Sequence, residues 1–536
     1  MKTIISISAL FALLIVTGAP SSPAAQILPV GEPGTELFYQ WLLHARAAGD
    51  SAALDYQIAP YVSHGISPGA FSYWPQLQTG ALANSHISSQ TNSQTKSPSI
   101  LRVYLAPSEE IAGEHQLQTA STARLRAGAT ARLSDNVSVM SSFILDEGLA
   151  GDPTYTGKVW RGLAGDVETA AVSYQNEKLT LLAGRYRTSW GPQFTNLLLS
   201  QTAAPLDGAS LRYRFGRKLT FSYQLARLDP ISPDPLSQDT VSIFINRYLA
   251  AHRIDFRFSN AVRIGLFESV LYAGPGRSVE LQFLNPLIFF HGNQLNEDNN
   301  DNTFLGFDYD IRIKHKLNLF GQVLVDDFQI DNKTQGDQEP NEIGFLIGGR
   351  LNDMLPLFDI KMQWNRVTNR TYNQKLPRNR YLNQNRPLGY PLGNDFETYR
   401  LDILRWFGRE QLLRLSGMIQ RRGQGRITDP WSEPWLATSG PYSEPYLTGT
   451  VERTSTLEFG YQTLFSGLFS RSSGSSRSSG SSRSSGSSRT NRQGLLRATL
   501  GWKTVKNEAN LAGVDRDSFY IRLNFSLFLA ADIKLN

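Results

Sequence analysis

The sequence contains no cysteine in its 536 residues. Disulfide bonds, thiol chemistry and a lipid anchor attached through cysteine are therefore excluded. A second absence is that no stretch after residue 25 approaches the ~20 apolar residues that a membrane-spanning helix needs. Such a chain can enter a membrane only as a closed β-barrel, in which neighbouring strands pair every backbone polar group.

Charged residues are also scarce, at 19% of the chain, and the net charge of +6 is unevenly placed. Lys2 and the four arginines of the low-complexity run 470–489 carry five of those six positive charges, so the rest of the chain is nearly neutral. The main part of the protein therefore lacks the excess of basic residues that nucleic-acid binding requires, and we expect no nucleic-acid partner.

Motifs for catalysis and metal binding are missing as well. The seven histidines form no HExxH motif, and the chain has neither a Walker loop nor a GxSxG motif. Oxygen-rich residues at 296–302, Asp326, Asp327 and Asp331 could hold calcium, but they lack the spacing of an EF-hand. We therefore predict that the protein is not an enzyme and uses neither a cofactor nor a metal.

Residues 1–25 have the layout of a secretory signal peptide. Lys2 precedes an apolar stretch over 4–16, and the small residues Ala24 and Ala25 suit cleavage. The chain is therefore expected to be exported.

Residues 26–98 form a separate segment. Within it, apolar residues recur at spacings of three and four over 36–48, which is typical of an amphipathic helix. We interpret 26–98 as a small helical cap or plug in the periplasm. The alternative is a flexible leader.

From residue 99 to residue 530, apolar and polar residues alternate with a period of two. In the last such segment, Phe519, Ile521, Leu523 and Phe525 share one face, and polar residues share the other. This period predicts β-strands. A soluble β-sandwich alternates in the same way, so export and the lengths of the connections must decide between a sandwich and a barrel.

The connections between these strands are alternately short and long. We count eighteen segments, an even number as in bacterial single-chain barrels, and nearly every second joint is a tight turn. With the amino-terminal end in the periplasm, the long joints all face outward. They include 188–208, 229–249, 273–303, 368–395 and 421–449. The prediction is an all-β fold, a transmembrane antiparallel β-barrel of about 18 strands over 99–530 in the bacterial outer membrane.

One joint departs from this alternation. By its place in the strand order, 464–493 is periplasmic and should be short, yet it holds the Arg/Ser/Gly run 470–489. Sequence rich in glycine and serine forms a flexible coil without core-forming residues. We interpret 470–489 as a flexible connection on the periplasmic side.

Three parts of this region resemble the Wzi family of outer-membrane capsule assembly proteins. They are the run 184–192 with 196–200 and 204–205, the segments from Glu268 through 283–286, 289–291, 301–302 and 306–308 to 322–328, and the run 388–393. The resemblance covers roughly 99–530. It implies an eighteen-stranded barrel with a helical periplasmic piece that acts as a lectin for capsular or related polysaccharide. Gln193 stands where the family usually has glycine.

The long joints supply candidate residues for binding sugars. Trp190 offers a flat face for a sugar ring, unless it wedges its loop into the barrel mouth, and Arg378 could pair with an acidic sugar. Polar side chains could bond sugar hydroxyls or form a buried network inside the lumen. Trp435 and Tyr446 could stack on sugars or belong to an aromatic girdle. The full candidate set is Arg185, Trp190, Glu268, Asn285, His291, Asn302, Asp308, Asp326, Asp327, Arg378, Trp435 and Tyr446.

These features predict a lectin-like outer-membrane barrel that binds and retains capsular or related surface polysaccharide and assists capsule assembly. Several weak loop contacts with a repeating polymer would sum to firm retention. The alternative is an outer-membrane porin or an uptake channel for oligosaccharides, whose polar inner face lines a water-filled path. We expect surface polysaccharide, outer-membrane lipids and other polysaccharide export proteins as partners.

Overall fold

The computed structural model describes most of residues 99–535 and three residue pairs before them. The pairs are 27–28, 58–59 and 61–62, and the gaps after residue 99 are 115–117, 233–243, 298–299, 315, 330–333, 335–337, 354–357, 409, 440 and 467–488. The predicted signal peptide 1–25, the predicted helix over 36–48 and the run 470–489 apart from Arg489 lie outside the described residues.

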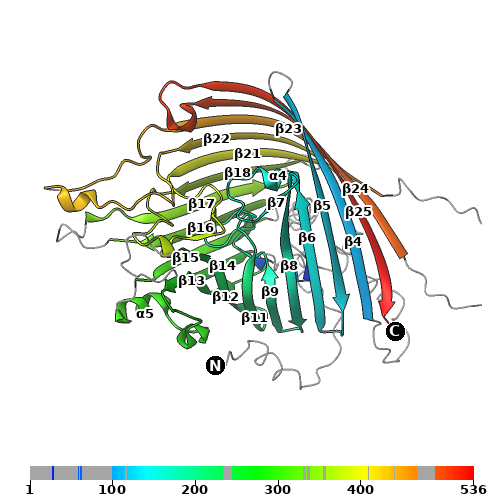
Figure 1. Cartoon of the computed structure of the whole chain (residues 1–536), viewed down its shortest axis with the longest axis horizontal. Coiled ribbons are helices and arrows are strands. Elements are labelled where there is room, and N and C mark those ends of the chain that lie inside the picture. Colours follow the sequence, from blue (N-terminus) through cyan, green and yellow to red (C-terminus); the bar gives the residue numbers. More distant parts are fainter. Residues whose placement is uncertain are drawn as a thin grey trace, which may run out of the picture.

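The described residues form a closed antiparallel barrel of eighteen long strands (Figure 1). The strands are β4 (Ser99–Glu114), β5 (Gln118–Arg132), β6 (Val137–Asp146), β8 (Leu163–Gln175), β9 (Leu179–Tyr186), β11 (Leu206–Phe215), β12 (Leu219–Ile231), β13 (Ile245–Arg257), β14 (Val262–Gly274), β15 (Asn302–Ile313), β16 (Leu317–Asp327), β17 (Glu342–Leu351), β18 (Phe358–Val367), β21 (Phe396–Phe407), β22 (Gln411–Arg422), β23 (Glu452–Ser466), β24 (Arg489–Lys506) and β25 (Arg516–Leu535). The barrel closes where β25 pairs with β4, from Tyr520 opposite Glu114 to Leu535 opposite Ser99. The predicted fold and strand count are confirmed.

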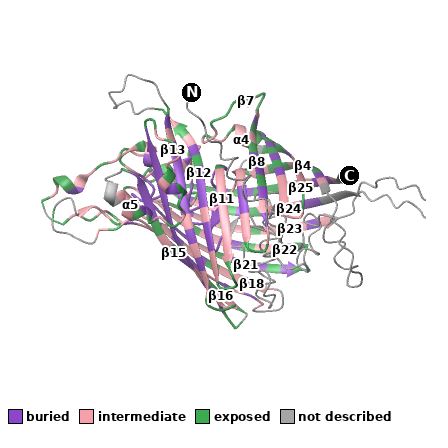
Figure 2. Cartoon of the chain, turned by 90° about the horizontal axis from the view of Figure 1, so that it is seen from below, coloured by how far each residue is buried: buried purple, intermediate pink, exposed green. Residues whose placement is uncertain are grey.

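The period of two places apolar side chains on the outside of this barrel. Phe519, Ile521, Leu523 and Phe525 of β25 are all exposed on the outer face, whereas the intervening Tyr520 is buried. Exposed and buried residues alternate along many strands in Figure 2. Because successive side chains of a strand point to opposite faces, this pattern gives the wall one apolar and one polar side.

Connection lengths follow the predicted order, with one exception at each end of the barrel. At the end where β4 begins, β5 to β6, β8 to β9 and β11 to β12 are joined by tight turns, but β23 and β24 are joined by 467–488. At the other end, β4 and β5 are separated by only 115–117, although we expected a longer first joint. The joint is short because β4 continues through Pro107 to Glu114, where it pairs with both β5 and β25.

Short elements lie in the connections. They are β1 (Ile27–Leu28), β2 (Ile58–Ala59), β3 (Tyr61–Val62), α4 (Glu147–Ala150), β7 (Val159–Trp160), β10 (Ser189–Trp190), η3 (Leu281–Leu284), α5 (Phe290–Glu297), η5 (Pro377–Asn379), β19 (Leu382–Asn383), β20 (Arg386–Pro387), η6 (Pro434–Ala437) and η7 (Glu508–Asn510). Strand β1 pairs with β3, and β2 pairs with β10. In the described part of the chain, no helix is both long and apolar enough to cross a membrane.

Candidate functional site

The connection from β9 to β11, which we call the lumen loop (residues 187–205), packs against the inner face of the wall. Trp190, Leu197, Leu198 and Leu199 are buried in one apolar cluster with inward residues of the wall. The wall residues of this cluster include Phe267, Phe304, Phe320, Leu324, Leu346 and Phe396. The lumen loop is therefore a packed plug, and Trp190 lies within it and is not open to solvent.

A polar network, the lumen network, ties the lumen loop to the wall. Gln322 accepts from the backbone N–H of Leu197 at 2.5 Å and donates to the carbonyl of Trp190 at 3.0 Å. The same amide donates to Asp308 at 3.4 Å, and Asp308 also accepts from both terminal nitrogens of Arg253. Arg253 bonds Asp255 as well, with its Nε 2.9 Å from one carboxylate oxygen. These buried charges are thus paired, as groups removed from water must be.

The connection from β18 to β21 (residues 368–395), which we call the β18–β21 loop, covers the lumen loop. Tyr381 donates to the carbonyl of Leu198 at 3.0 Å, and Tyr372 donates to that of Leu197. Asn383 donates to the carbonyl of Pro205 at 3.2 Å. These bonds link the two loops into one interlocked layer, although the bonded positions are about 180 residues apart in the sequence.

The β18–β21 loop also binds the other long connections. Arg386 pairs with Asp152 at 2.7 Å, in the connection from β6 to β8. Arg370 pairs with Glu444 at 3.1 Å, in the connection from β22 to β23. Asn379 donates to the carbonyl of Asn300, in the connection from β14 to β15. The long connections at the end of the barrel opposite the tight turns therefore hold one another.

A polar pocket, the rim pocket, opens where the β18–β21 loop meets the connection from β14 to β15. Its volume is about 650 Å³, and its lining includes Arg277, Glu280, Gln282, Asn300, Asp301 and Arg378. Arg277 holds Glu280 at 2.6 Å and Asp301 at 3.1 Å. The buried Nε of Arg378 has no hydrogen-bond partner among the described residues. Hydrogen-bond donors and acceptors, and charged groups of both signs, thus line one open space.

A second cavity of about 970 Å³ lies inside the barrel, along the wall from β22 through β25 to β4 and β5. Its lining is polar and includes Glu114, Glu452, Glu458, Lys503 and Arg522. These residues alternate with the exposed apolar residues of the outer face, so they point into the lumen. The described loops therefore fill one side of the lumen and leave a polar space on the other.

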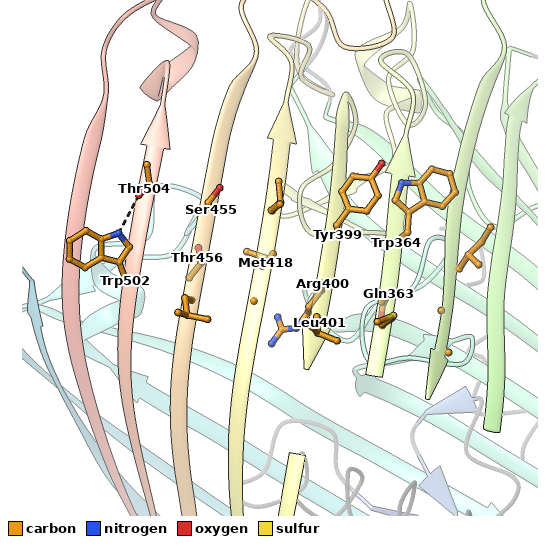
Figure 3. Close-up of a pocket in the computed structure, with 17 residues that line it drawn as sticks. Gln363, Trp364, Tyr399, Arg400, Leu401, Met418, Ser455, Thr456, Trp502 and Thr504 are labelled. Atoms are coloured by element: carbon orange, nitrogen blue, oxygen red, sulfur yellow. Dashed lines mark hydrogen bonds between the residues drawn. The ribbon is translucent and has the colours of Figure 1, made fainter. Parts of the chain in front are cut away.

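A third hollow lies on the outer face and is apolar (Figure 3). It has a volume of about 620 Å³ and crosses strands β17 to β24, with Trp364, Tyr399 and Trp502 among its lining residues. The indole of Trp502 donates to Thr504 at 3.3 Å, and Trp364 and Tyr399 both donate to Glu397 at 2.9 Å. Rings with an apolar body and a polar tip suit a membrane interface, so this groove fits the lipid-facing surface of the wall.

Four of the predicted site residues meet around the lumen loop. Trp190 and Asp308 are linked through Gln322. Asp326 accepts from the backbone N–H of Tyr372 at 2.6 Å, and Asn302 donates to the carbonyl of Asn379 at 3.2 Å. Of the two roles considered for these residues, the contacts correspond to the buried network.

Three predicted residues lie elsewhere, on the outside of the wall. Glu268 shares the outer face of β14 with the exposed Leu266, and it accepts from the backbone N–H groups of Phe290 and His291. His291 and Asn285 belong to the connection that covers this face. Placing Glu268 and His291 in a lumen network is therefore wrong. The alternation with a period of two already predicts the outer face for Glu268, since it is two residues from the outward Leu266.

Arg185 and Asp327 make local contacts. Arg185 pairs with Asp207 of the neighbouring strand at 2.6 Å. Asp327, at the end of β16, accepts from the backbone N–H of Phe328 at 2.7 Å. Neither residue lines the rim pocket, whereas Arg378 does.

Trp435 and Tyr446 are held by arginines. The guanidinium of Arg370 lies 4.4 Å from the ring centre of Trp435, which is only 2% exposed. The guanidinium of Arg366 lies 3.7 Å from the ring centre of Tyr446. Cation–π contacts of this kind stabilise the loop and occupy faces that a sugar ring would need.

The sequence prediction missed the residues that complete the rim pocket, namely Arg277, Glu280, Gln282 and Asp301. The turn 274–276 before Arg277 was the only local sign that the chain bends back over the wall there. Arg277 and Arg378 are about 100 residues apart, and no spacing rule links them. Their proximity follows from contacts of η5 with β14.

A half-buried carboxyl group near the rim, that of Glu339, gives a pH-dependent prediction. Burial, aided by the charge of Asp327, raises the pKa of Glu339 to about 7. Between its ordinary pKa and about 7 the folded state keeps a proton that the unfolded state has lost, so stability falls as pH rises through this window. In Glu339→Gln this pH-dependent loss of folding stability should disappear. Its size is on the order of 1 kcal/mol, after allowance for solvent screening. Hydrogen exchange around 338–342, measured at about pH 5 and about pH 8, checks this. Equal pH dependence in both proteins would contradict it.

Comparison with known proteins identifies relatives of this barrel. A family model described as capsule assembly protein Wzi matches residues 108–493. A solved structure of Wzi from Escherichia coli, an outer-membrane carbohydrate-binding β-barrel involved in group 1 capsule assembly, aligns with a TM-score of 0.52 and 13% sequence identity. The alignment covers 95% of this chain and all of that one.

Other solved outer-membrane barrels are less similar. OccD3 (OpdP) from Pseudomonas aeruginosa aligns with a TM-score of 0.43 and 10% identity, over 81% of this chain and 92% of that one. OccAB1 from Acinetobacter baumannii aligns with a TM-score of 0.44 and 10% identity, over 83% of this chain and all of that one. No curated protein sequence matches significantly. Because the family model spans well over half of the chain, this outer-membrane β-barrel belongs to the Wzi family of capsule assembly proteins.

Proposed function

We propose that this barrel is lectin-like, and that it binds and retains capsular or related surface polysaccharide at the outer membrane. The observation that carries the proposal is the rim pocket, an open polar space lined mainly by the connection from β14 to β15 and by Arg378 of the β18–β21 loop. Its position at the loop-covered end suits a ligand that arrives from outside the cell, because long loops of such barrels face outward.

The chemistry of the rim pocket fits a sugar chain. Sugar hydroxyls both donate and accept, and the lining offers carboxylates, amides and guanidinium groups. Arg378 can bind a uronic acid carboxylate through two parallel hydrogen bonds. One such site binds weakly, but a repeating polymer can engage several barrels at once, and the contacts sum to firm retention.

The contacts in the rim pocket favour binding of a sugar chain over its hydrolysis. Glycoside hydrolysis needs two carboxyl groups, one of them free to give up a proton. In the rim pocket, Glu280 and Asp301 both bind the same guanidinium, that of Arg277. Their pairing with one cation supports a role in shaping the pocket.

Replacing Arg378 tests the proposal. Arg378→Ala should weaken binding of purified acidic capsular oligosaccharide about 10-fold to 100-fold, the value of a hydrogen bond to a charged group. Isothermal titration calorimetry measures this, with Arg217→Ala, in the turn 216–218 at the other end of the barrel, as the matched control. In a gene deletant complemented with each variant, Arg378→Ala should move polysaccharide from the cells to the medium.

Two outcomes would count against the proposal in different ways. Unchanged affinity of Arg378→Ala would remove the rim pocket as the binding site. A wild-type coat on cells that lack the gene would refute retention itself.

A channel for oligosaccharides is the second candidate, and the polar cavity in the lumen is the observation that favours it. The packed lumen loop weighs against a wide path. Single-channel recording of the wild-type protein in planar bilayers separates the two, because a large steady conductance requires an open lumen.

We also propose that 26–98 is a periplasmic cap or plug. Its support is the pairing of Ile58 and Ala59 with Trp190 and Ser189 of the lumen loop. With Ile58 and Ala59 paired to the lumen loop, such a segment would meet other polysaccharide export proteins from the periplasmic side.

A further inference from the structure

The connection from β14 to β15 (residues 275–301), which we call the outer-wall loop, covers part of the outer face of the barrel. The face is set by alternation, because Leu266 is exposed on the outside and Glu268 and Tyr272 follow it at even spacing. Leu305 of β15 pairs with Glu268 and is exposed on the same side. Figures 1 and 2 both place α5 beyond the wall, near β13 and β15.

Polar contacts clamp the outer-wall loop to this face. Glu268 accepts from the backbone N–H of Phe290 at 3.1 Å and from that of His291 at 2.7 Å, where α5 begins. His252, opposite Glu268 on β13, approaches the same carboxylate at 3.1 Å. A carboxylate on the apolar face of a barrel is costly unless it is paired, so the loop and Glu268 stabilise each other.

Aromatic rings fill the space between the wall and the loop. Tyr248 and Tyr272 stack with 5.3 Å between ring centres, and Phe283 lies 4.5 Å from Tyr272. Phe290 stacks on His252 at 4.6 Å. Outward tyrosines at the top of the apolar band usually face the lipid interface. Here the outer-wall loop covers these rings instead.

The exposed residues of the loop between 281 and 291 are mostly apolar, with Asn285 and His291 as the polar ones. Leu287 is 78% exposed, Phe289 58% and Leu284 43%. Phe289 precedes Phe290, whose backbone N–H reaches Glu268, and Glu268 is only two residues, about 7 Å, from the outward Leu266 along the strand. The exposed residues therefore continue the apolar band of the wall, whose surroundings are the hydrocarbon of the membrane.

We propose that the outer-wall loop is a membrane-anchoring element that inserts Leu284, Leu287 and Phe289 among the acyl chains of the outer leaflet. Apolar burial of these side chains supplies the driving force. Arg277, Glu280 and Asp301 of the rim pocket belong to the same connection. Anchoring the loop thus holds the pocket at the membrane surface.

Spin labelling tests this directly, because the chain has no cysteine of its own. Nitroxides are attached to Leu287→Cys and Phe289→Cys in the full barrel, reconstituted in phosphatidylcholine vesicles. Leu305→Cys on the apolar band is the membrane control, and Ser443→Cys, exposed in the connection from β22 to β23, is the aqueous control. The measured quantity is the ratio of collision with oxygen, which enters lipid, to collision with a nickel chelate, which stays in water.

The expected ratio at Leu287 and Phe289 is close to that at Leu305 and several-fold above that at Ser443. A ratio equal to that at Ser443 would overturn the proposal. Dipolar broadening between labels would also overturn it, because a second copy of the chain would then cover the loop. Glu268→Ala removes the clamp and should lower the ratio at Leu287 while the barrel stays folded, as judged by its heat-modifiable migration on gels.

Discussion

An Arg253→Ala variant should be less stable than the wild type by about 3–5 kcal/mol, the cost of removing one partner from a buried ion pair. Arg253 is fully buried between Asp255 and Asp308, and its loss leaves both carboxylates without their cation. Asp308 also orients Gln322, which holds the lumen loop. Urea titration followed by tryptophan fluorescence measures the difference.

Arg217→Ala is the matched control for Arg253→Ala. Arg217 is exposed in the turn between β11 and β12, so its removal should change stability by no more than about 0.5 kcal/mol. Arg253→Lys should lie between the wild type and Arg253→Ala, because lysine keeps the charge but cannot reach both carboxylates with a planar fork. A loss below 1 kcal/mol in Arg253→Ala would mean that the lumen network does not hold the plug.

The second large effect is expected from the plug itself. Leu197→Ala and Leu198→Ala should each cost about 2–5 kcal/mol, and the pair less than the sum, because the two side chains are adjacent. Both leucines are completely buried against the wall and the β18–β21 loop. The wall keeps its own hydrogen bonds, so the barrel should stay closed while the lumen loop detaches.

Single-channel conductance is the decisive measurement for the double variant, which should conduct several-fold better than the wild type. Leu436 and Leu511 are exposed, and replacing both with alanine should change neither conductance nor stability. If neither the double variant nor the wild type conducts, another part of the chain closes the lumen. If the wild type conducts as strongly as the double variant, the channel becomes the better proposal.

The barrel could be predicted from the sequence because its determinants are local and repeated. Strand after strand places apolar residues such as Leu523 and Leu500 on one face, and tight turns such as 216–218 fix which strands are neighbours. The first joint is shorter than expected because β4 continues through Pro107, but this does not alter the fold, because both neighbouring strands still impose the register. The resemblance to the Wzi family rests on the same region.

The candidate site was predicted only in part, since loops of 20 to 30 residues have no period that fixes where their side chains point. Trp190 was expected either to stack on a sugar ring or to wedge its loop into the barrel mouth. It is buried within the lumen loop, and its partner Gln322 comes from a strand more than 100 residues away. Glu268 was expected either to bond sugar hydroxyls or to join a buried network inside the lumen. Its position two residues from Leu266 in fact places it on the outer face.

The sequence by itself determined the exported, closed, eighteen-stranded wall, because period two and turn length act between neighbours in the chain. Tertiary structure alone decided what the loops do. Only when the wall closes do the lumen loop, the β18–β21 loop and the outer-wall loop come within hydrogen-bonding distance of one another. The plug and the rim pocket are consequences of that closure, since each joins residues that are far apart in the chain, whereas Glu268 is covered by the connection that follows its own strand.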